Sequence, residues 1–403
     1  MASQAETKKA RPSSRRIFRP GNRYLIAYLT FLSAFAPLST DMYLPAMPTM
    51  AEALATTDDL VSNSLTAFFV VYALSTLFWG PLSDRYGRKP VLIAGSIIYI
   101  VTSVISAITS SIWVLLAMRA LQATGCAAAS AMSLAIVKDI LRGDFMEKIV
   151  SFMQAAHILA PMCAPVIGGG LLYFMNWRGI FWALAICGAF ALAGAFGLRE
   201  TARQGKAASL GAAFQALARV LRNTTFLKPF LIFSCLTMPF MSFLAVSTFV
   251  YQDMFGLTPQ AFSLFFAMNA AFSLAAPLAH LYWFAKLDRR ATLSCEILIM
   301  SLCGIGMLFL GSRGPWAFAL LMAPITFCGG AMRPPSTVVM LEANRGDNGA
   351  VAALIQCGAL LFASVSMFAA PQPFWPTPVT AIATISATVS GLCLIAWLFV
   401  SRK

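Results

Sequence analysis

Charged residues are scarce in this chain of 403 residues: Asp, Glu, Lys and Arg together make up 11% of it, whereas apolar residues make up 59%. Soluble globular domains carry about 25% charged and about 45–50% apolar residues, so the composition excludes an ordinary soluble domain. The mean hydropathy of +0.77 points the same way. We therefore place the chain in a lipid bilayer.

Residues that carry enzyme or metal chemistry are equally scarce. The chain has two histidines, and none of its nine cysteines forms a Cys-x-x-Cys pair, so neither a metal site nor a disulfide framework is supported. There is no Gly-x-x-x-x-Gly-Lys-Ser/Thr loop for a nucleotide, no Ser/His/Asp set and no paired-carboxylate site. We expect no enzyme activity, no metal and no cofactor, and an ion gradient as the energy source.

Long apolar runs fill most of the chain instead. Each has about 20 residues, the length of a helix that crosses a bilayer. The sequence predicts an all-α membrane protein with twelve transmembrane helices in two pseudo-symmetric bundles of six. The predicted runs cover residues 24–47, 61–82, 91–110, 113–137, 149–175, 180–198, 229–251, 261–284, 292–311, 316–339, 350–370 and 379–400.

One polar stretch divides the twelve runs into two sets of six. It covers residues 199–228 and contains six basic residues, so we interpret it as a cytoplasmic linker between an N-terminal bundle (24–198) and a C-terminal bundle (229–400). A faint repeat supports the division, because Asp84-Arg85 recurs as Asp288-Arg289 at the matching point of the second half. Two parallel halves of this kind are typical of one large group of transporters.

The net charge of +14 follows the membrane topology. With a cytoplasmic N-terminus, 25 of the 29 Lys and Arg residues fall on the cytoplasmic side, as the positive-inside rule requires. The exceptions are Arg178 and Arg313 outside, and Arg119 and Arg333 within runs. We therefore expect both termini in the cytoplasm, a basic cytoplasmic tail over residues 1–23 near anionic lipid, and no nucleic-acid partner.

A charged loop over residues 80–90 separates the second and third runs. Glycines and prolines break the helices there, and the cost of burying charge holds the basic residues out of the bilayer. The pattern resembles the loop between helices two and three of the major facilitator superfamily. The resemblance implies a gate that locks the two halves when the cytoplasmic side is closed. The candidate gating residues are Gly80, Asp84, Arg85, Gly87 and Arg88.

Four Asp, Glu or Arg residues lie inside predicted runs, where the cost of charge makes each a candidate for function. Asp41 and Arg119 lie at similar depth near the outer ends of helices one and four, and we predict that they couple proton movement. Glu296 and Arg333 lie near the inner ends of helices nine and ten, and we predict a secondary ion pair. For either pair, the alternative is a salt bridge that only holds helices together.

Two of these residues stand in motifs that narrow the family. Asp41 precedes Tyr43-Leu44-Pro45, similar to the signature of the bicyclomycin and chloramphenicol resistance branch of the drug:proton antiporters, in which the Asp is a protonation or substrate-binding site. Arg119 begins a segment similar to the superfamily motif Arg-x-x-Gln-Gly-x-Gly, whose Arg is associated with proton coupling. This chain has Ala123 where that motif has its first Gly.

The fifth run carries Pro161, Pro165, Gly168 and Gly169, and it resembles the proline and glycine antiporter motif of exporters. Glycines let a second helix approach closely, and prolines free carbonyl groups and bend the span. A bent, closely packed helix suits a surface that rocks. The alternative is a kinked helix with a packing role in any transporter.

Polar and soft side chains within the runs are candidates for a substrate cavity, because such side chains adapt to varied ligands. For each of them the alternative is ordinary packing or contact with lipid. The candidates are Tyr43, Gln122, Gln154, His157, Met238, Met241, Asn269 and Gln356.

The motifs together imply a monomeric, multi-pass antiporter of the bacterial inner membrane. We expect it to export partly apolar small molecules from the cytoplasm by alternating access, in exchange for incoming protons. A proton-coupled uptake symporter of the same fold is the alternative, and the motif in the fifth run argues against it. A membrane protein that transports nothing is disfavoured because the chain lacks any catalytic constellation.

Overall fold

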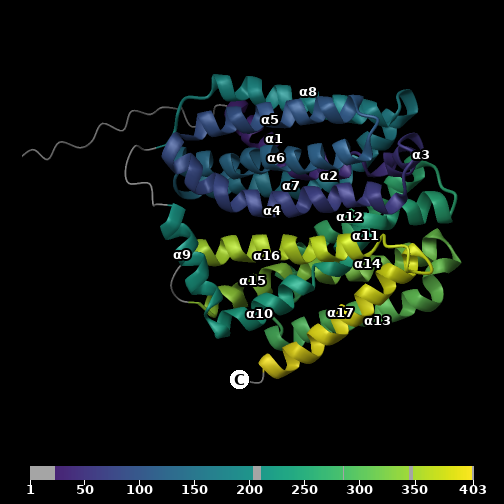
Figure 1. Cartoon of the computed structure of the whole chain (residues 1–403). Coiled ribbons are helices and arrows are strands. Elements are labelled where there is room, and N and C mark those ends of the chain that lie inside the picture. Colours follow the sequence, from purple (N-terminus) through teal and green to yellow (C-terminus); the bar gives the residue numbers. More distant parts are fainter. Residues whose placement is uncertain (1–22, 203–209, 285, 345–347, 402–403) are drawn as a thin grey trace, which may run out of the picture.

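The computed structural model describes residues 23–202, 210–284, 286–344 and 348–401, and within these ranges it contains helices and turns but no strand (Figure 1). Eleven helices in this part of the chain are long and apolar enough to cross a membrane. A pair of helices bent by 45° in the first span makes a twelfth. The predicted all-α class with twelve spans is confirmed.

The first bundle contains the first six spans, and its first span is interrupted. Its elements are α1 (Arg23–Ser33), α2 (Phe35–Asp41), η1 (Leu44–Ala46), α3 (Met47–Ala53), α4 (Asp58–Tyr86), α5 (Arg88–Ile108), α6 (Ile112–Ile140), α7 (Gly143–Phe174) and α8 (Trp177–Gly197).

The second bundle follows a short helix, α9, that lies at one end of the molecule (Figure 1). The elements are α9 (Leu210–Leu221), α10 (Thr224–Cys235), α11 (Met238–Phe249), η2 (Val250–Met254), α12 (Pro259–Ala279), η3 (His280–Phe284), α13 (Arg289–Leu310), η4 (Gly311–Arg313), α14 (Pro315–Ala331), α15 (Arg333–Glu342), α16 (Asn348–Ala369) and α17 (Pro378–Val400).

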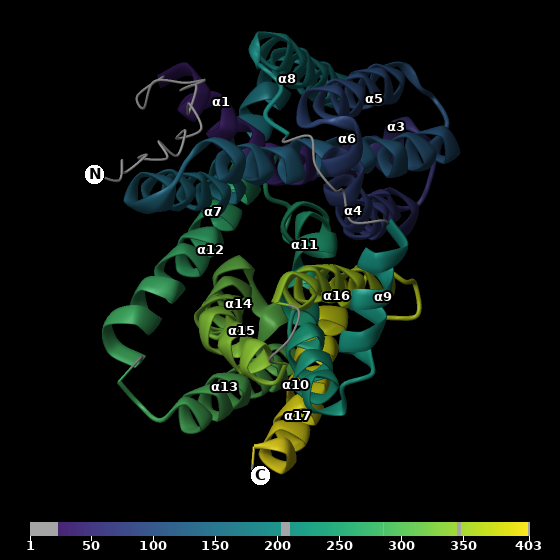
Figure 2. The same cartoon turned by 90° about the vertical axis from the view of Figure 1, so that its left-hand side faces the viewer.

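The two bundles pack side by side (Figures 1 and 2). Helix α4 packs against α16, and α7 packs against α12. We call the end that holds residues 83–90, 138–142 and 197–202 the basic end, and the end that holds residues 42–58 and 250–259 the far end.

The seventh span begins inside the stretch that the sequence assigns to the linker. The side chain of Asn223 accepts a hydrogen bond from Thr225 N (3.0 Å) and so caps α10 at its start. Phe226 is fully buried and stacks on Phe230, with ring centroids 5.3 Å apart. A cap followed by a buried aromatic pair therefore extends this helix toward the basic end.

Proline sets the breaks in the first span. Pro37 has no N–H to donate to the Ser33 carbonyl, and α1 ends at Ser33. Nδ1 of His157 on α7 donates to that carbonyl instead, at 2.9 Å. In the same way Pro45 cannot donate to the Asp41 carbonyl, and α2 ends at Asp41. The predicted coupling carboxylate thus lies at a helix terminus that its own sequence creates.

The same spacing accounts for two breaks in the second bundle. Helix α10 ends at Cys235, four residues before Pro239, and α14 ends at Ala331, four residues before Pro335. The seventh and tenth spans are therefore interrupted inside the protein. The residues at both breaks keep right-handed helical backbone angles, so Thr224–Met254 and Pro315–Glu342 each still cross as one span.

Candidate functional site

Arg119 is fully buried on α6 and is held without a carboxylate. Its Nη1 donates to the Ser39 carbonyl at 3.2 Å and to Oε1 of Gln122. The guanidinium carbon lies 4.4 Å from the ring centroid of Tyr43 and 4.6 Å from that of Phe68. Neutral oxygens and aromatic faces thus stabilise this cation inside the N-terminal bundle.

Two residues predicted for the substrate cavity belong to the surroundings of Arg119. Gln122 is fully buried, and its Nε2 donates to Ser103 Oγ at 2.6 Å. Tyr43 is also fully buried, and its hydroxyl lies 3.1 Å from Ser64 Oγ. For these two the cavity prediction is wrong in this structure, because their polar groups are committed to neighbouring helices.

Asp41 is buried beside this cluster, with 4% of its surface exposed. Its Oδ1 accepts a hydrogen bond from Thr40 Oγ1 at 2.7 Å. The ion pairs of the described residues join Arg88 to Asp84 and Asp139, and Arg289 to Glu342.

Asp41 and Arg119 therefore do not form an ion pair here. Nη1 of Arg119 donates to the Ser39 carbonyl and to Gln122, and Nε and Nη2 of Arg119 have no hydrogen-bond partner. The Asp41 carboxylate is consequently not committed to a cation, and its role in proton coupling stays a prediction.

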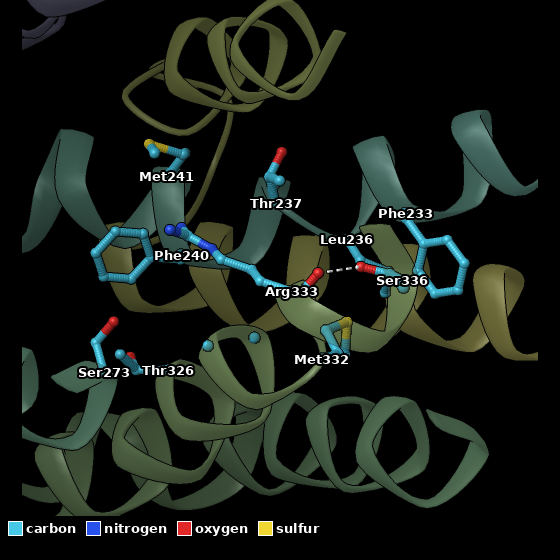
Figure 3. A pocket seen from close by; sticks show the side chains of 12 residues that line it. Phe233, Leu236, Thr237, Phe240, Met241, Ser273, Thr326, Met332, Arg333 and Ser336 are labelled. Carbon is cyan, nitrogen blue, oxygen red and sulfur yellow. Dashed lines mark hydrogen bonds between the residues drawn. The ribbon is translucent and has the colours of Figure 1, made fainter. Parts of the chain in front are cut away.

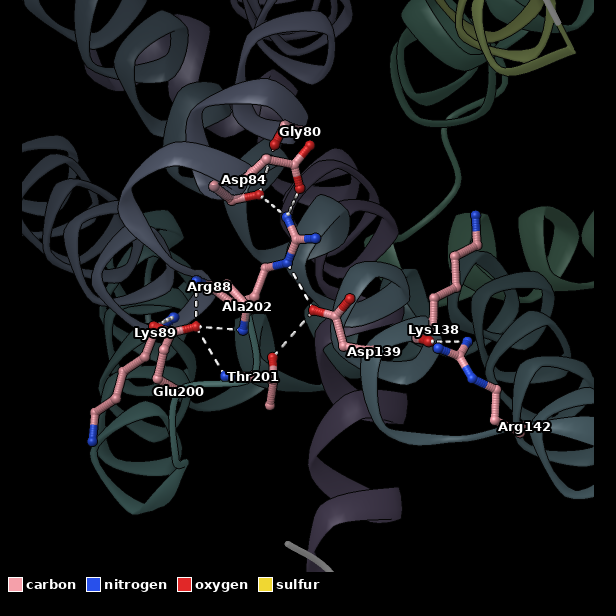
Figure 4. Close-up of polar contacts among 11 residues, drawn as sticks. Gly80, Asp84, Arg88, Lys89, Lys138, Asp139, Arg142, Glu200, Thr201 and Ala202 are labelled. Atoms are coloured by element: carbon pink, nitrogen blue, oxygen red, sulfur yellow. Dashed lines mark hydrogen bonds and ion pairs between the residues drawn. The ribbon is translucent and has the colours of Figure 1, made fainter. Parts of the chain in front are cut away.

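Arg88 is the centre of a polar network at the basic end (Figure 4). Its Nη1 lies 2.6 Å from Asp84 Oδ1 and also donates to Ser83, and its Nε lies 2.9 Å from Asp139 Oδ2. Thr201 donates to the same Asp139 oxygen at 3.3 Å. The network ties α4, α5 and α6 together within one bundle.

Glu200 completes this network from beyond the sixth span. Its carboxylate accepts hydrogen bonds from the backbone N–H groups of Arg88, Lys89, Thr201 and Ala202, at 2.8–3.2 Å. Partial burial raises the pKa of Glu200, but the four backbone donors outweigh it and bring the pKa below its usual value. Glu200 was not among the residues predicted from the sequence, although an acid beside the start of α5 suits the helix dipole.

The predicted gating residues lie in different surroundings. Gly87 has φ +101°, which favours glycine, and a Cβ there would overlap the Glu200 carboxylate. The Arg85 guanidinium lies over the ring of Tyr86, 5.3 Å from its centroid. A Cβ on Gly80 would meet open space. The structure thus brings Asp84, Gly87 and Arg88 together. Gly80 joins them through its carbonyl, which accepts from Ser83 Oγ at 2.8 Å, whereas Arg85 lies outside the network.

The hydrogen bonds between the two bundles, among the described residues, lie toward the far end. Four hydrogen bonds of 2.7–3.0 Å join the bundles within the described residues. They run from Ser62 to the Ala245 carbonyl, from Gln252 to the Pro45 carbonyl, from Gln260 to the Gly169 carbonyl and from Ser263 to the Pro165 carbonyl.

At the basic end, the side chain of Asp84 is half exposed and pairs with Arg88 of its own bundle. No hydrogen bond or ion pair joins the two bundles there among the residues that the structure describes. The described residues therefore join the two bundles by hydrogen bonds at the far end and not at the basic end.

The glycines of α7 allow these far-end contacts. A Cβ on Gly168 would overlap the Met42 carbonyl oxygen, and a Cβ on Gly169 would lie 2.6 Å from Ser263 Oγ of α12. A Cβ on Gly170 would meet nothing within 4 Å. Gly168 thus admits the first span, and Gly169 admits the opposite bundle beside Pro165. The role of this segment, with Pro161, in antiport stays a prediction.

A pocket of about 50 Å³ lies in the C-terminal bundle, between the two interrupted spans and α12 (Figure 3). We call it the Arg333 pocket, because the Arg333 side chain extends across it toward Phe240 (Figure 3). Its walls combine hydroxyl groups with apolar side chains. They include Thr237, Phe240, Met241, Ser273 and Thr326.

The predicted ion pair between Glu296 and Arg333 is wrong in this structure. Glu296 on α13 is 5% exposed, lies near Cys328 of α14, and neither carboxylate oxygen has a hydrogen-bond partner. Arg333 lines the pocket against α10 and α11. Similar depth on neighbouring spans was the basis of the prediction. Glu296 on α13 instead lies near Cys328 of α14, whereas Arg333 follows the break after Ala331 and lines the pocket.

Met241 is the one predicted cavity residue that lines this pocket. The remaining candidates are exposed elsewhere (Gln154, His157 and Gln356), half-buried (Met238) or buried (Asn269). The sequence did not indicate that Thr237, Thr326 and Arg333 line a common pocket. The signal that could have found them is the proline four residues after each helix end, which marks the interruptions of the seventh and tenth spans.

The sequence profile of the Major Facilitator Superfamily matches residues 29–367, which is most of the chain. The chain belongs to this superfamily. A solved structure of the peptide transporter POT superposes with a TM-score of 0.76 at 14% identity, over 94% of each chain. At that identity the likeness supports the superfamily fold and nothing finer.

Curated relatives confirm the resemblance to the drug-resistance branch of the superfamily. The "Bicyclomycin resistance protein homolog" of Haemophilus influenzae is 28% identical over 304 residues, which are 74% of this chain and 76% of that protein. The "Chloramphenicol resistance protein" of Pseudomonas aeruginosa is 38% identical over 161 residues, which are 39% of this chain and 38% of that protein. The match thus spans well under half of the second relative.

Proposed function

We propose that this superfamily member is a proton-coupled antiporter that exports partly apolar small molecules from the bacterial cytoplasm. The observation that carries the proposal is the carboxylate of Asp41, buried inside the first span and without a cationic partner among the residues that the structure describes. A charged side chain at such a depth costs free energy, so an ionisable residue there indicates a functional role. A carboxylate that takes and releases a proton there is suited to coupling.

The proton gradient is large enough to drive this export. One proton that moves inward across 100 mV releases about 2.3 kcal/mol, and a tenfold concentration ratio costs about 1.4 kcal/mol. One proton per cycle therefore sustains more than a tenfold gradient of a neutral substrate. Asp41 would release its proton when exposed to the cytoplasm and take one when exposed to the outside.

We assign the basic end to the cytoplasm, which places both termini there in an inner membrane. The basic residues of the loops support this orientation through the positive-inside rule. Because the described residues join the bundles by hydrogen bonds at the far end and not at the cytoplasmic end, we assign the structure to an inward-facing state. In the opposite state, Asp84 would contact the start of α16, because a helix N-terminus favours an anion.

Export is favoured over uptake by two observations. The proline and glycine segment of α7 lies on the contact surface with α12, where Ser263 bonds to the Pro165 carbonyl at 2.7 Å. The curated relatives are named for resistance to antibiotics, which export confers.

The decisive test is accumulation of labelled chloramphenicol in an efflux-deficient bacterium that carries this chain. We expect lower accumulation than in cells with the empty vector, and loss of the difference on addition of a protonophore. Bicyclomycin and a panel of other antibiotics would be screened by growth inhibition in the same strain. Higher accumulation of any compound that responds to the protonophore would identify an uptake symporter and contradict the proposal.

A further inference from the structure

Arg333 carries a permanent charge that the described residues do not neutralise. The ion pairs found among them involve other arginines, and hydrogen bonds at Arg333 involve its backbone carbonyl, which accepts from Ser336 and Thr337. A guanidinium inside a membrane protein normally has a carboxylate, a carbonyl group or water beside it. Its position in a pocket leaves it available to a ligand.

The acidic side chains of the C-terminal bundle that the structure describes are engaged or placed elsewhere. Asp288 caps α13 through Ala291 N at 2.8 Å, and Glu342 pairs with Arg289 at 2.8 Å. Asp253 lies at the far end in η2, and Glu296 lies on α13 near Cys328. No carboxylate among these is an internal counter-ion for Arg333.

Local sequence directs Arg333 into the pocket. It is the first residue of α15, directly after the break that Pro334 and Pro335 impose on the tenth span. Ser336 lies three residues later on the same helix face and lines the same pocket. Figure 3 shows the guanidinium between Phe240, Thr237 and Met241, which belong to the seventh span.

The walls of the pocket add a free hydroxyl and an apolar face. Thr326 is 3% exposed, and its Oγ1 has no hydrogen-bond partner. A buried hydroxyl without a partner is costly, so a ligand that accepts its hydrogen bond would gain affinity. Phe240 and Met241 offer an aromatic and a polarizable surface beside the charge. The combination fits a molecule with an acidic group attached to an apolar body.

The size of the pocket limits what enters it. Whole ligands usually occupy about 300–1,000 Å³, whereas this pocket measures about 50 Å³. It therefore accommodates one functional group and not a whole substrate. A planar carboxylate is the group whose geometry the arginine fork matches.

We propose that the Arg333 pocket is an anion subsite, which receives the carboxylate of an acidic amphipathic substrate. The inference rests on the proposed function in one respect: the ligand is taken to be the molecule that is exported. Arg333 and Thr326 bind the carboxylate, and Phe240 and Met241 contact the adjoining apolar part.

The test compares two matched probes on the purified full chain in detergent. One is 2-naphthoate, and the other is the neutral 2-naphthamide, which has the same shape. We expect the wild type to bind the anion about tenfold more tightly or better, as charge-assisted hydrogen bonds imply. The Arg333→Gln variant should lose the preference for 2-naphthoate over 2-naphthamide and should still bind the amide weakly. Arg289→Gln removes an exposed arginine of the same bundle and should leave the preference unchanged.

Two further variants keep the test decisive if Arg333→Gln does not fold. Arg333→Lys should retain a reduced preference for the anion, and Met241→Glu should remove it by placing a carboxylate on the pocket wall. Equal binding of the two probes by the wild type, or an undiminished preference in Met241→Glu, would overturn the proposal. So would an equal loss in Arg289→Gln, which would indicate a diffuse charge effect. Binding in detergent needs no proton gradient, so these outcomes are independent of whether the chain exports anything.

Discussion

The two bundles each keep one arginine within a span, and they use it in opposite ways. Arg119 is fully buried, donates to two neutral oxygens and lies over aromatic rings. Arg333 extends across a pocket, with no ion pair among the described residues. The two bundles share a topology, but the surroundings of their arginines within the spans differ. We interpret the N-terminal bundle as the half that holds the proton site, and the C-terminal bundle as the half that meets the ligand.

The largest expected difference between the two arginines is the stability that the protein loses when each is replaced by alanine. Arg119→Ala leaves a cavity between α2, α4 and α6, and we expect a loss of about 2–4 kcal/mol by analogy with large-to-small core substitutions. Arg333→Ala removes an exposed side chain, and we expect a change within about 1 kcal/mol. Thermal unfolding of both variants in detergent measures the difference. Equal losses would remove the distinction between the two sites.

The glycines of α7 allow the packing of this helix against the first span to be disrupted at a chosen point. Gly168→Ala introduces a Cβ where the Met42 carbonyl lies. We expect a cost of about 1–3 kcal/mol from overpacking, together with impaired export. Gly170→Ala is the matched control, since a Cβ there meets open space. If the two variants behave alike in unfolding and export, the close approach of the first span is not what Gly168 provides.

The far-end hydrogen bonds should bias the protein toward the inward-facing state. Ser263→Ala removes the bond to the Pro165 carbonyl, and a typical net contribution of about 0.5–1.5 kcal/mol shifts the equilibrium about 2- to 13-fold. Spin labels at Glu52 and Asp253, in a background without native cysteines, report the separation across the far end. We expect a larger population of long distances than in the wild type. Ser294→Ala on α13 serves as the control, and an identical distribution in Ser263→Ala would assign this bond no part in the bias.

The smallest expected effect concerns Glu200 and pH. Its pKa in the folded protein is lower than in the unfolded chain, because four backbone donors outweigh partial burial. Its contribution to stability is therefore complete above the unfolded value of about 4.3, and it is lost as pH falls through the folded pKa. On acidification below about pH 4.3, the unfolding temperature of the wild type should fall more steeply than that of Glu200→Gln. Parallel curves would show that Glu200 does not stabilise the start of α5.

Much of the fold could be predicted from the sequence because each span must satisfy its backbone internally and must be long and apolar. The number of spans follows from that constraint alone. The start of the seventh span did not follow, because Asn223 and Phe226 extend a helix into a polar stretch. Hydropathy averages over many residues and does not register a single cap.

The site was less predictable, because depth along a span does not fix the direction of a side chain. Asp41 and Arg119 lie close in depth but have separate partners, and Glu296 and Arg333 have different neighbours. The helix breaks decide these directions. A proline in the sequence is not sufficient to predict a helix break, since α7 continues through Pro161 and Pro165.

Proton coupling at Asp41 is tested most directly by comparing two kinds of transport in proteoliposomes that contain the wild type or Asp41→Asn. Both proteins should exchange a labelled substrate, chosen by the accumulation and growth-inhibition screens, across the membrane when no gradient is present. Only the wild type should accumulate it when a pH gradient is imposed, because the amide matches the carboxylate in size but cannot take up a proton. Accumulation by Asp41→Asn at the wild-type rate would contradict the assignment of Asp41 as the proton site.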